Sequence, residues 1–262
     1  MGGKSSRHRT SRPQAPARPS PQPQVPAPPT PQPQAPREPS QAPREPRQTE
    51  PSSENGNTNL KEPHNCEAIL NDADILIDKS SIEELQDQLY AGVFLNQKRK
   101  KYWVERISHH NCFMLFARDL AITWADNERY WHWPGFKERS DAFVDVAEML
   151  MVCWLEVHGR FDTTKLSPGI VYEVFFVVML KEPVYGWEVP VNLRLIVPDG
   201  STQEHKENLM EKERGQWIEI LAGKFMAAPD NVGDIQFSLY EYEGGIWKKG
   251  LLVKGVAIRP KA

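Results

Sequence analysis

Proline and aromatic residues occupy different parts of this 262-residue chain, and this separation limits what each part can fold into. Residues 1–51 hold 15 of the 23 prolines, and the first Phe, Tyr or Trp along the chain is Tyr90. A segment so rich in proline and without aromatic side chains buries too little apolar surface to offset the entropy of ordering it. The sequence therefore predicts a disordered leader over residues 1–65, rich in Pro, Gln and Arg.

Short apolar runs bounded by turn residues dominate the chain from Cys112 onwards. The clearest is VPVNLRLIVPDG at 189–200, where apolar and polar residues alternate and Asp199-Gly200 supplies a hairpin turn. In 151–161 the alternation places Val152 and Trp154 on the same side of a strand. Many short strands without intervening helices are typical of an all-β fold, an antiparallel β-sandwich of jelly-roll-like type.

One or two short helices are expected beside these strands. Ser81 and Glu84 form a capping-box pattern, after which Leu85 and Leu89 share one helical face. Within the strand-rich region only residues 141–150 have a helical pattern.

These features divide the chain into three parts. The leader, 1–65, is followed by a short helical and basic connecting segment over 66–107. The remainder, 108–262, is the predicted globular domain, and it carries most of the aromatic residues needed for a core.

Charge and cysteine content exclude several classes of protein. The leader segment 1–51 has a net charge of +5 and the remainder −8, so the folded part lacks the broad basic face that nucleic-acid binding requires. Three widely spaced cysteines without a CxxC pair predict reduced thiols in an intracellular protein, with Cys66 or Cys112 able to crosslink partners if exposed. The chain contains neither a secretory signal nor a run of 18 apolar residues.

Two short motifs bear on localisation. MGGKSS fits the N-myristoylation pattern with Gly2 as acceptor, which is the only route to a membrane that the sequence offers. The run Lys98, Arg99, Lys100 and Lys101 fits a minimal nuclear-import signal or an anionic-surface contact. A solvated turn between two strands explains the same four cations equally well.

The stretch DLAITWADNERYWHWP, residues 119–134, places three tryptophans within ten residues of a polar segment. They are either core residues or an aromatic platform for a flat ligand such as a sugar, whose C–H face stacks on indole while polar side chains bind its hydroxyls. Trp131 lies in the most polar part and is expected to be exposed in a loop. Trp124 is expected at a strand end, and Trp133-Pro134 below the loop.

Templates for catalysis and metal binding find no match in the sequence. There is no GxSxG, P-loop or GxGxxG motif, and Glu241 and Glu243 would lie on one face of a strand, a poor geometry for flanking a scissile bond. A non-enzymatic protein without a metal site or cofactor is therefore predicted. The following histidines lack metal-ligand spacing: His109, His110, His132, His158 and His205.

Seven sequence blocks, taken in order, resemble the plant phloem protein 2 family, whose lectin domain is the Nictaba-type domain of tobacco. The resemblance runs from Cys112 to Ala262, and GVFLNQKRKKYWVE before it looks like the family's A-type members. An F-box pattern does not precede it, which disfavours the F-box branch. The blocks are LFARDLAITW, YWHWP, CWLEVHGRF, LSPGIVYEVFFVVMLK, YGWEVPVNLRLIVPDG, WIEILAGKF and GDIQFSLYEYEGGIWKKGLLVKGVAIRPK.

The resemblance implies a non-catalytic lectin for chitin-type N-acetylglucosamine oligomers and N-glycan cores, acting in phloem and stress defence. Its partners would be glycoproteins carrying such glycans, in the cytoplasm and nucleus of sieve elements and companion cells. The alternative is a structural phloem protein that assembles with filament-forming phloem protein 1, with sugar binding secondary. Homodimerisation stays open.

The resemblance also implies a binding site. Its two tryptophans map to Trp124 and Trp131, and its two carboxylates to Asp234 and Glu241, where Asp234 stands in place of the family's Glu. Neighbouring residues that would support the site are Trp133 and Glu243.

Overall fold

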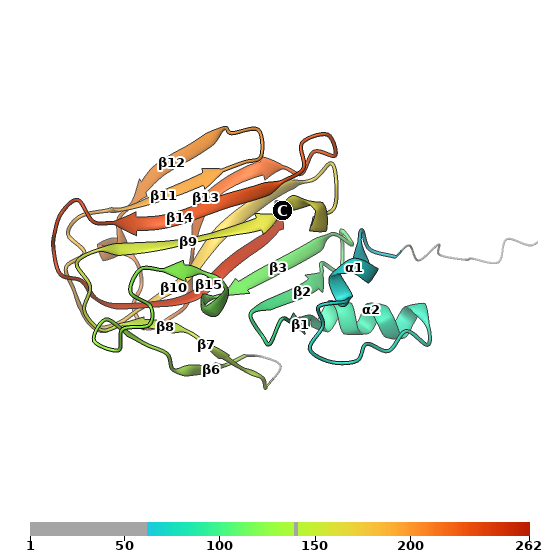
Figure 1. The fold of residues 1–262 in the computed structure, drawn as a ribbon, viewed down its shortest axis with the longest axis horizontal. Helices are drawn as coiled ribbons and strands as arrows, with labels where there is room; N and C mark the ends of the chain where they lie inside the picture. The colour runs from blue at the N-terminus through green and yellow to red at the C-terminus, as the bar shows by residue number, and fades with distance from the viewer. Residues whose placement is uncertain (1–61, 139–140) are drawn as a thin grey trace, which may run out of the picture. The chain divides into compact units, whose positions relative to one another are not determined.

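The structure, a computed structural model, describes residues 62–138 and 141–262, all of which belong to one compact unit, Gly56–Ala262 (Figure 1). The acylation of Gly2 and the expected disorder of the leader as far as residue 61 concern residues outside the described part. Residues 62–65, which the prediction also placed in the leader, are described, and the His64 carbonyl accepts a hydrogen bond from the Asn111 side chain at 2.7 Å. Within it, two α-helices precede a strand-rich region: α1 (Cys66–Leu70) and α2 (Ile82–Ala91).

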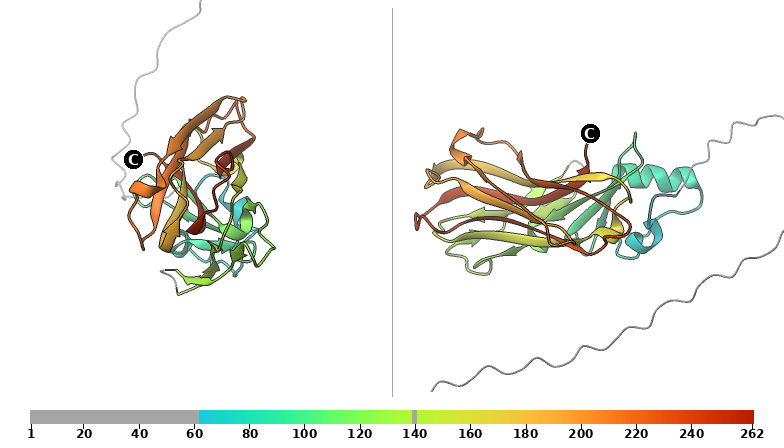
Figure 2. Two further views of the ribbon diagram at one scale, coloured as in Figure 1. Left: turned by 90° about the vertical axis from the view of Figure 1, so that its left-hand side faces the viewer. Right: turned by 90° about the horizontal axis from the view of Figure 1, so that it is seen from above.

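Two antiparallel sheets make up the body, in layers that can be followed in Figures 1 and 2. The first runs β1-β2-β3-β15-β10-β13, with β8 beside β15 and β5 beside β8; the second runs β12-β11-β14-β9-β4. From β9 to β15 the chain alternates between the sheets except at the β11–β12 hairpin. This confirms the predicted antiparallel β-sandwich of jelly-roll-like type.

The strands of the first sheet are β1 (Val93–Leu95), β2 (Lys100–Val104), β3 (Asn111–Phe116), β5 (Trp131–His132), β8 (Ala147–Met149), β10 (Val171–Tyr185), β13 (Ile218–Met226) and β15 (Lys249–Pro260). Those of the second sheet are β4 (Ala121–Ile122), β9 (Leu155–Asp162), β11 (Val191–Ile196), β12 (Thr202–Glu207) and β14 (Asp234–Glu241). Outside both sheets lie the hairpin β6 (Gly135–Lys137) with β7 (Phe143–Asp145), and the 3-10 turns η1 (Ala117–Asp119), η2 (Thr163–Lys165) and η3 (Leu209–Glu211).

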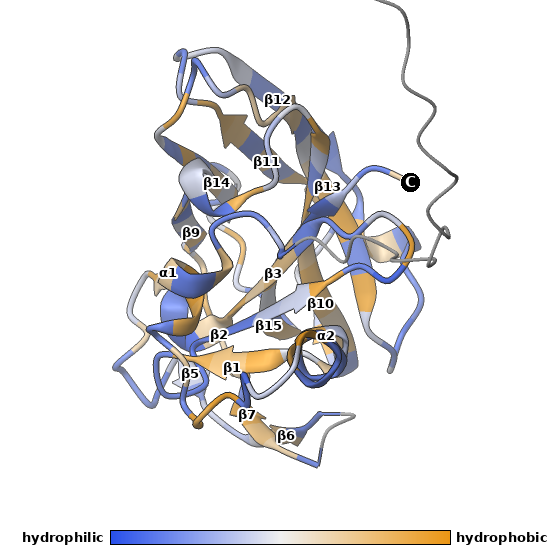
Figure 3. Cartoon of the chain, turned by 90° about the vertical axis from the view of Figure 1, so that its right-hand side faces the viewer, coloured by the Kyte–Doolittle hydropathy of each residue, from blue (hydrophilic) through white to orange (hydrophobic). Residues whose placement is uncertain are grey.

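Period-two patterning builds the core between the sheets. Along β11, Val191, Leu193 and Leu195 are fully buried while the residues between them reach the outer face. Orange and blue bands alternate accordingly along β11 in Figure 3. Phe176 of β10 meets Phe237 of β14 edge to face at 6.0 Å between ring centroids, which joins the two layers.

Helix α2 forms as the capping pattern predicts. The Ser81 hydroxyl accepts a hydrogen bond from the Glu84 backbone N–H at 3.2 Å, and Leu85 and Leu89 are buried. No helix among the described residues is long and apolar enough to cross a membrane.

The helical expectation for 141–150 is wrong, because this segment contributes strands β7 and β8. Ala147 and Met149 are buried on either side of the half-exposed Glu148, and Ala147 pairs with Val253 of β15. Pairing with the sheet thus overrides a weak local helical preference. Residues 66–107 also do more than connect, since they supply β1 and β2 to the edge of the first sheet.

Candidate functional site

In the tryptophan-rich stretch, the buried Trp131 and the half-buried Trp133 hold the backbone on either side of the exposed Trp124. The Trp131 indole N–H donates to the Thr123 carbonyl, and that of Trp133 to the Ala125 carbonyl, both at 3.0 Å. Trp124 lies between these two anchored peptides, with φ at +60° and 45% of its surface exposed. A positive φ is unusual for an aromatic residue, and here it turns the indole out of the protein. The same stretch therefore contains indoles that pack in the protein, those of Trp131 and Trp133, and one indole that is exposed to solvent, that of Trp124.

The expected exposure of Trp131 is wrong. Its side chain is 1% exposed, and its backbone pairs with Met149 as part of β5. The polar sequence around it reflects the exposed turn 125–129 before it rather than the environment of the indole itself. A buried indole has no face to offer a ligand, and of the two predicted tryptophans only Trp124 exposes its indole.

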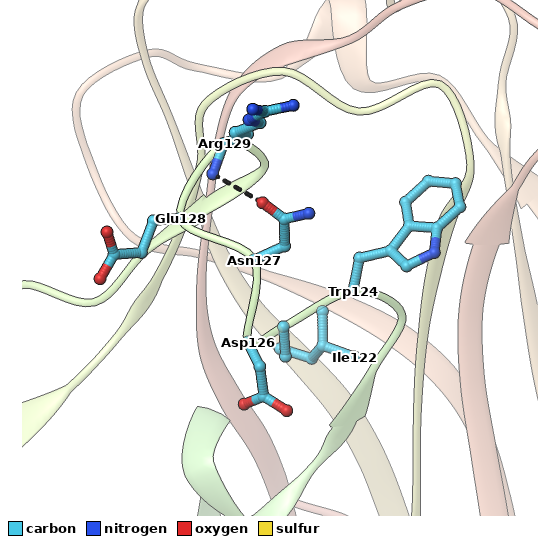
Figure 4. A pocket seen from close by; sticks show the side chains of 7 residues that line it. Ile122, Trp124, Asp126, Asn127, Glu128 and Arg129 are labelled. Atoms are coloured by element: carbon cyan, nitrogen blue, oxygen red, sulfur yellow. Dashed lines mark hydrogen bonds between the residues drawn. The ribbon is translucent and has the colours of Figure 1, made fainter.

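A shallow depression of about 690 Å³ opens beside Trp124. Figure 4 shows the indole on one side and the Glu128 carboxylate on the opposite side. Asn127 fixes the turn between them, because its side-chain oxygen accepts the backbone N–H of Arg129 at 3.0 Å. Carboxylate, amide and guanidinium groups thus line the depression across from one exposed indole, with Asp126 and Arg129 completing the polar lining.

The carboxylate of Glu156 on β9 links this region to a second exposed indole. Its Oε2 accepts hydrogen bonds from the Thr123 hydroxyl at 3.0 Å and from the Trp154 indole N–H at 3.2 Å. Trp154 is 42% exposed, although alternation in the sequence placed it on the same side as the fully buried Val152. That expectation fails because β9 begins only at Leu155, so the period of two does not extend back to Val152.

Trp154 is the functional candidate that the sequence reasoning missed. Tyr242 stacks on it with ring centroids 4.4 Å apart and planes 13° apart, and Tyr240 stacks on Tyr242 at 5.5 Å. Arg194 ends the column, with its guanidinium 5.1 Å from the Tyr240 ring centroid and donating to the Tyr240 hydroxyl at 2.9 Å. Aromatic residues in the block GDIQFSLYEYEGG were the available signal, since Tyr240 and Tyr242 share one strand face.

Glu241, a predicted sugar contact, is buried and ion-paired. It is 1% exposed and its carboxylate meets the ammonium of Lys248, which is fully buried. Glu241 Oε1 also accepts the Gly244 backbone N–H at 2.8 Å, and Lys248 donates to the Ile246 carbonyl at 2.9 Å. Glu241 points into the protein because it alternates with Tyr240 along β14, so it shapes the β14–β15 loop rather than a surface.

Asp234 is exposed but lies away from Trp124. It begins β14 opposite Asp162, whereas Glu241 ends the same strand opposite Leu155. Seven residues of extended chain span about 23 Å, and an odd spacing points the two side chains to opposite faces. The structure therefore does not bring the two predicted carboxylates together. Glu243 is exposed in the β14–β15 loop.

The four consecutive cations form the exposed turn between β1 and β2 together with the start of β2. Asp74 accepts the backbone N–H groups of Gln97 and Lys98, both at 2.6 Å, and so fixes this turn. Lys100 pairs with Asp119 at 3.5 Å, while Arg99 is exposed and Lys101 lies in β2. The solvated-turn interpretation describes this geometry, and nuclear import stays a prediction.

Cysteine crosslinking through Cys66 or Cys112 is contradicted by their burial, at 2% and 1% exposure. Burial raises the pKa of the Cys66 thiol to about 11 and that of Cys112 to about 12. Cys153 alone is partly exposed. Within residues 62–138 and 141–262, His, Cys, Asp and Glu form no cluster of three that could hold a metal ion.

Comparison with known proteins shows the family to which this chain is related. The phloem protein 2 family model matches residues 110–260. The chain belongs to the phloem protein 2 family. It is 51% identical over 205 residues to Protein PHLOEM PROTEIN 2-LIKE A1 of Arabidopsis thaliana, covering 77% of this chain and 82% of that protein. It is 45% identical over 204 residues to a protein of Luffa acutangula named Lectin, covering 77% of this chain and 96% of the Luffa protein.

Distant likenesses to this phloem protein 2 chain occur among solved structures. One is the CBM22-1 xylan-binding domain from Paenibacillus barcinonensis Xyn10C, at 14% identity and a TM-score of 0.31, covering 56% of this chain and 89% of that domain. A likeness this low carries no inference about shared function.

Proposed function

We propose that this phloem protein 2 member is a lectin whose site is centred on Trp124, and that it binds N-acetylglucosamine oligomers and the N-glycan core. The observation that carries the proposal is the indole of Trp124, turned outwards by its own backbone and bordered by Asn127 and Glu128. Similarity to the Luffa protein named Lectin supports carbohydrate binding, the coarser part of this proposal.

The chemistry of the depression suits a pyranose ring. The indole face covers the C–H patch of the sugar, while Asp126, Asn127 and Glu128 accept hydrogen bonds from its hydroxyls. Each such contact is worth about 1 kcal/mol net, so a single ring would bind with a Kd on the order of millimolar. The depression is shallow and open, which favours recognition of a glycan surface over enclosure of a small molecule.

Retention on a chitin column tests this proposal. Wild type is expected to bind and to elute with N-acetylglucosamine oligomers, and Trp124→Ala is expected to lose most of its retention. Trp247→Ala is the matched control, because that indole is 44% exposed, close to the 45% of Trp124, and does not line the depression. Equal retention of Trp124→Ala and wild type would rule out this site, and absence of wild-type retention would rule out this class of ligand.

A further inference from the structure

We propose that the stacked pair Trp154–Tyr242 is a second sugar subsite, and that the site takes a linear oligosaccharide spanning both indoles rather than a single terminal ring. This inference rests on the proposed function of Trp124 and extends it to Trp154, directly before β9, and to Tyr242 in the β14–β15 loop. The distinguishing feature is the Glu156 carboxylate, which accepts hydrogen bonds from the exposed indole of Trp154 and from the hydroxyl of Thr123, the residue directly before Trp124.

The geometry around Glu156 places the two subsites next to each other. Oε2 of Glu156 binds the hydroxyl of Thr123, the residue directly before Trp124, and also the indole N–H of Trp154. Thr123 is held in register by its backbone N–H, which donates to the Glu156 carbonyl at 3.0 Å. The two indoles follow and precede paired strands, since Trp124 comes two residues after β4, Trp154 comes directly before β9, and β4 pairs with β9.

Trp154 presents one indole face to solvent. Its other face is covered by Tyr242 in a nearly parallel stack, and its N–H edge is occupied by Glu156. An indole with 42% of its surface exposed in this setting has its uncovered face available for a sugar ring. Tyr242 itself is covered on both sides, by Trp154 and by Tyr240, so it positions Trp154 and is not a platform of its own.

The buried Glu241–Lys248 pair holds this subsite together. It closes the loop that carries Tyr242, through the Gly244 N–H and the Ile246 carbonyl. Lys248 also exchanges two backbone hydrogen bonds with Val152, at 2.7 and 3.0 Å, which anchors the loop to the segment leading into Trp154. Two stacked rings from distant parts of the chain are thereby fixed against each other.

The two exposed indoles and the carboxylate near them indicate the class of ligand. Two apolar faces flanking a hydrogen-bonding carboxylate suit successive rings of a linear, neutral oligosaccharide, and a monosaccharide would engage only one of them. Affinity should therefore rise with the number of rings until both indoles are covered.

Calorimetric titration of purified full-length protein with chitobiose and chitotetraose tests the second subsite. In wild type the tetramer is expected to bind about tenfold more tightly than the dimer, the value of one additional ring-stacking contact. Trp154→Ala is expected to remove this gain and to leave the dimer affinity within about twofold, while Trp154→Phe retains part of it. Phe143→Ala, which removes a 58% exposed aromatic ring from β7 outside both sheets, serves as the control and should behave as wild type.

The outcomes separate this inference from the proposed function. If Trp124→Ala weakens both ligands while Trp154→Ala binds the tetramer as wild type does, the second subsite is wrong and the function of Trp124 stands. If Phe143→Ala loses as much as Trp154→Ala, the assignment to Trp154 is wrong as well. Wild type that binds neither oligomer overturns both proposals.

Discussion

Trp124 and Trp131, seven residues apart, have opposite environments, and a mutation at each should have a different effect. Trp131→Ala removes a fully buried indole and leaves the Thr123 carbonyl without its donor. We expect a loss of about 3–5 kcal/mol in the free energy of unfolding, measured by urea denaturation. Trp124→Ala, at an exposed position, should cost less than about 1 kcal/mol. Equal costs would show that Trp124 also belongs to the core.

The buried Glu241–Lys248 pair gives a second residue-level prediction. Breaking the pair by Lys248→Met leaves a buried carboxylate unpaired, which should destabilise the protein by about 3–5 kcal/mol. The double variant Glu241→Leu with Lys248→Met removes both charges and should recover most of that loss, as measured by thermal unfolding. If the loss in the double variant equals the sum of the losses in Lys248→Met alone and Glu241→Leu alone, the two residues are not coupled.

At the scale of elements, the loop that follows β10 packs directly on the β14–β15 loop. Gly186 has φ at +82°, and a Cβ on it would lie 2.0 Å from the Trp247 carbonyl oxygen. Gly200, in the β11–β12 turn, has φ at +83° but open space around a Cβ. These two glycines separate the cost of the backbone conformation from the cost of a collision.

Alanine substitutions at the two glycines are therefore a matched pair. Gly200→Ala should cost about 1–2 kcal/mol for the left-handed conformation alone. Gly186→Ala should cost clearly more, because backbone atoms of Trp247 have to move. Denaturant midpoints at constant m-value measure the loss of unfolding free energy in each variant. Similar losses in the two variants would mean that the loop moves to accommodate the added methyl group at little cost.

For the whole molecule, the arrangement of the sheets determines thiol reactivity. Cys66 and Cys112 are buried, whereas Cys153 is half-buried, so a thiol reagent at pH 8 should label one cysteine in the native protein. All three should react after denaturation. Rapid native labelling of three thiols would show that the α1 and β3 regions open easily.

The same burial predicts that stability falls at alkaline pH. The pKa values of Cys66 and Cys112, about 11 and about 12, lie above the ordinary value of 9.0, so the folded protein binds these protons more tightly than the unfolded chain. Their contribution is fully present below pH 9 and is lost as the pH rises towards 12. A free energy of unfolding that stays constant from pH 8 to 11 would contradict it.

Local sequence patterns determined the class of fold. Alternation along Val191–Ile196 and the hairpin signal Asp199-Gly200 predicted a strand and turn that the structure contains, and the capping box at Ser81 predicted α2. These features depend on neighbours in the chain, through side-chain alternation, backbone preferences and local hydrogen bonds, so they can be read without knowing the fold. Residues 141–150 mark the limit, because sheet pairing there overrode a local helical preference.

Which residues share a surface was decided only by the tertiary structure. The family resemblance implied that Asp234 and Glu241 share one site, but an extended strand carries them to opposite ends and faces. Burial of Trp131 depends on its pairing with Met149, and exposure of Trp154 on where β9 begins. Sequence alone thus identified the aromatic and acidic groups. Long-range pairing between distant strands determined which of them face solvent, because exposure depends on contacts that no local pattern encodes.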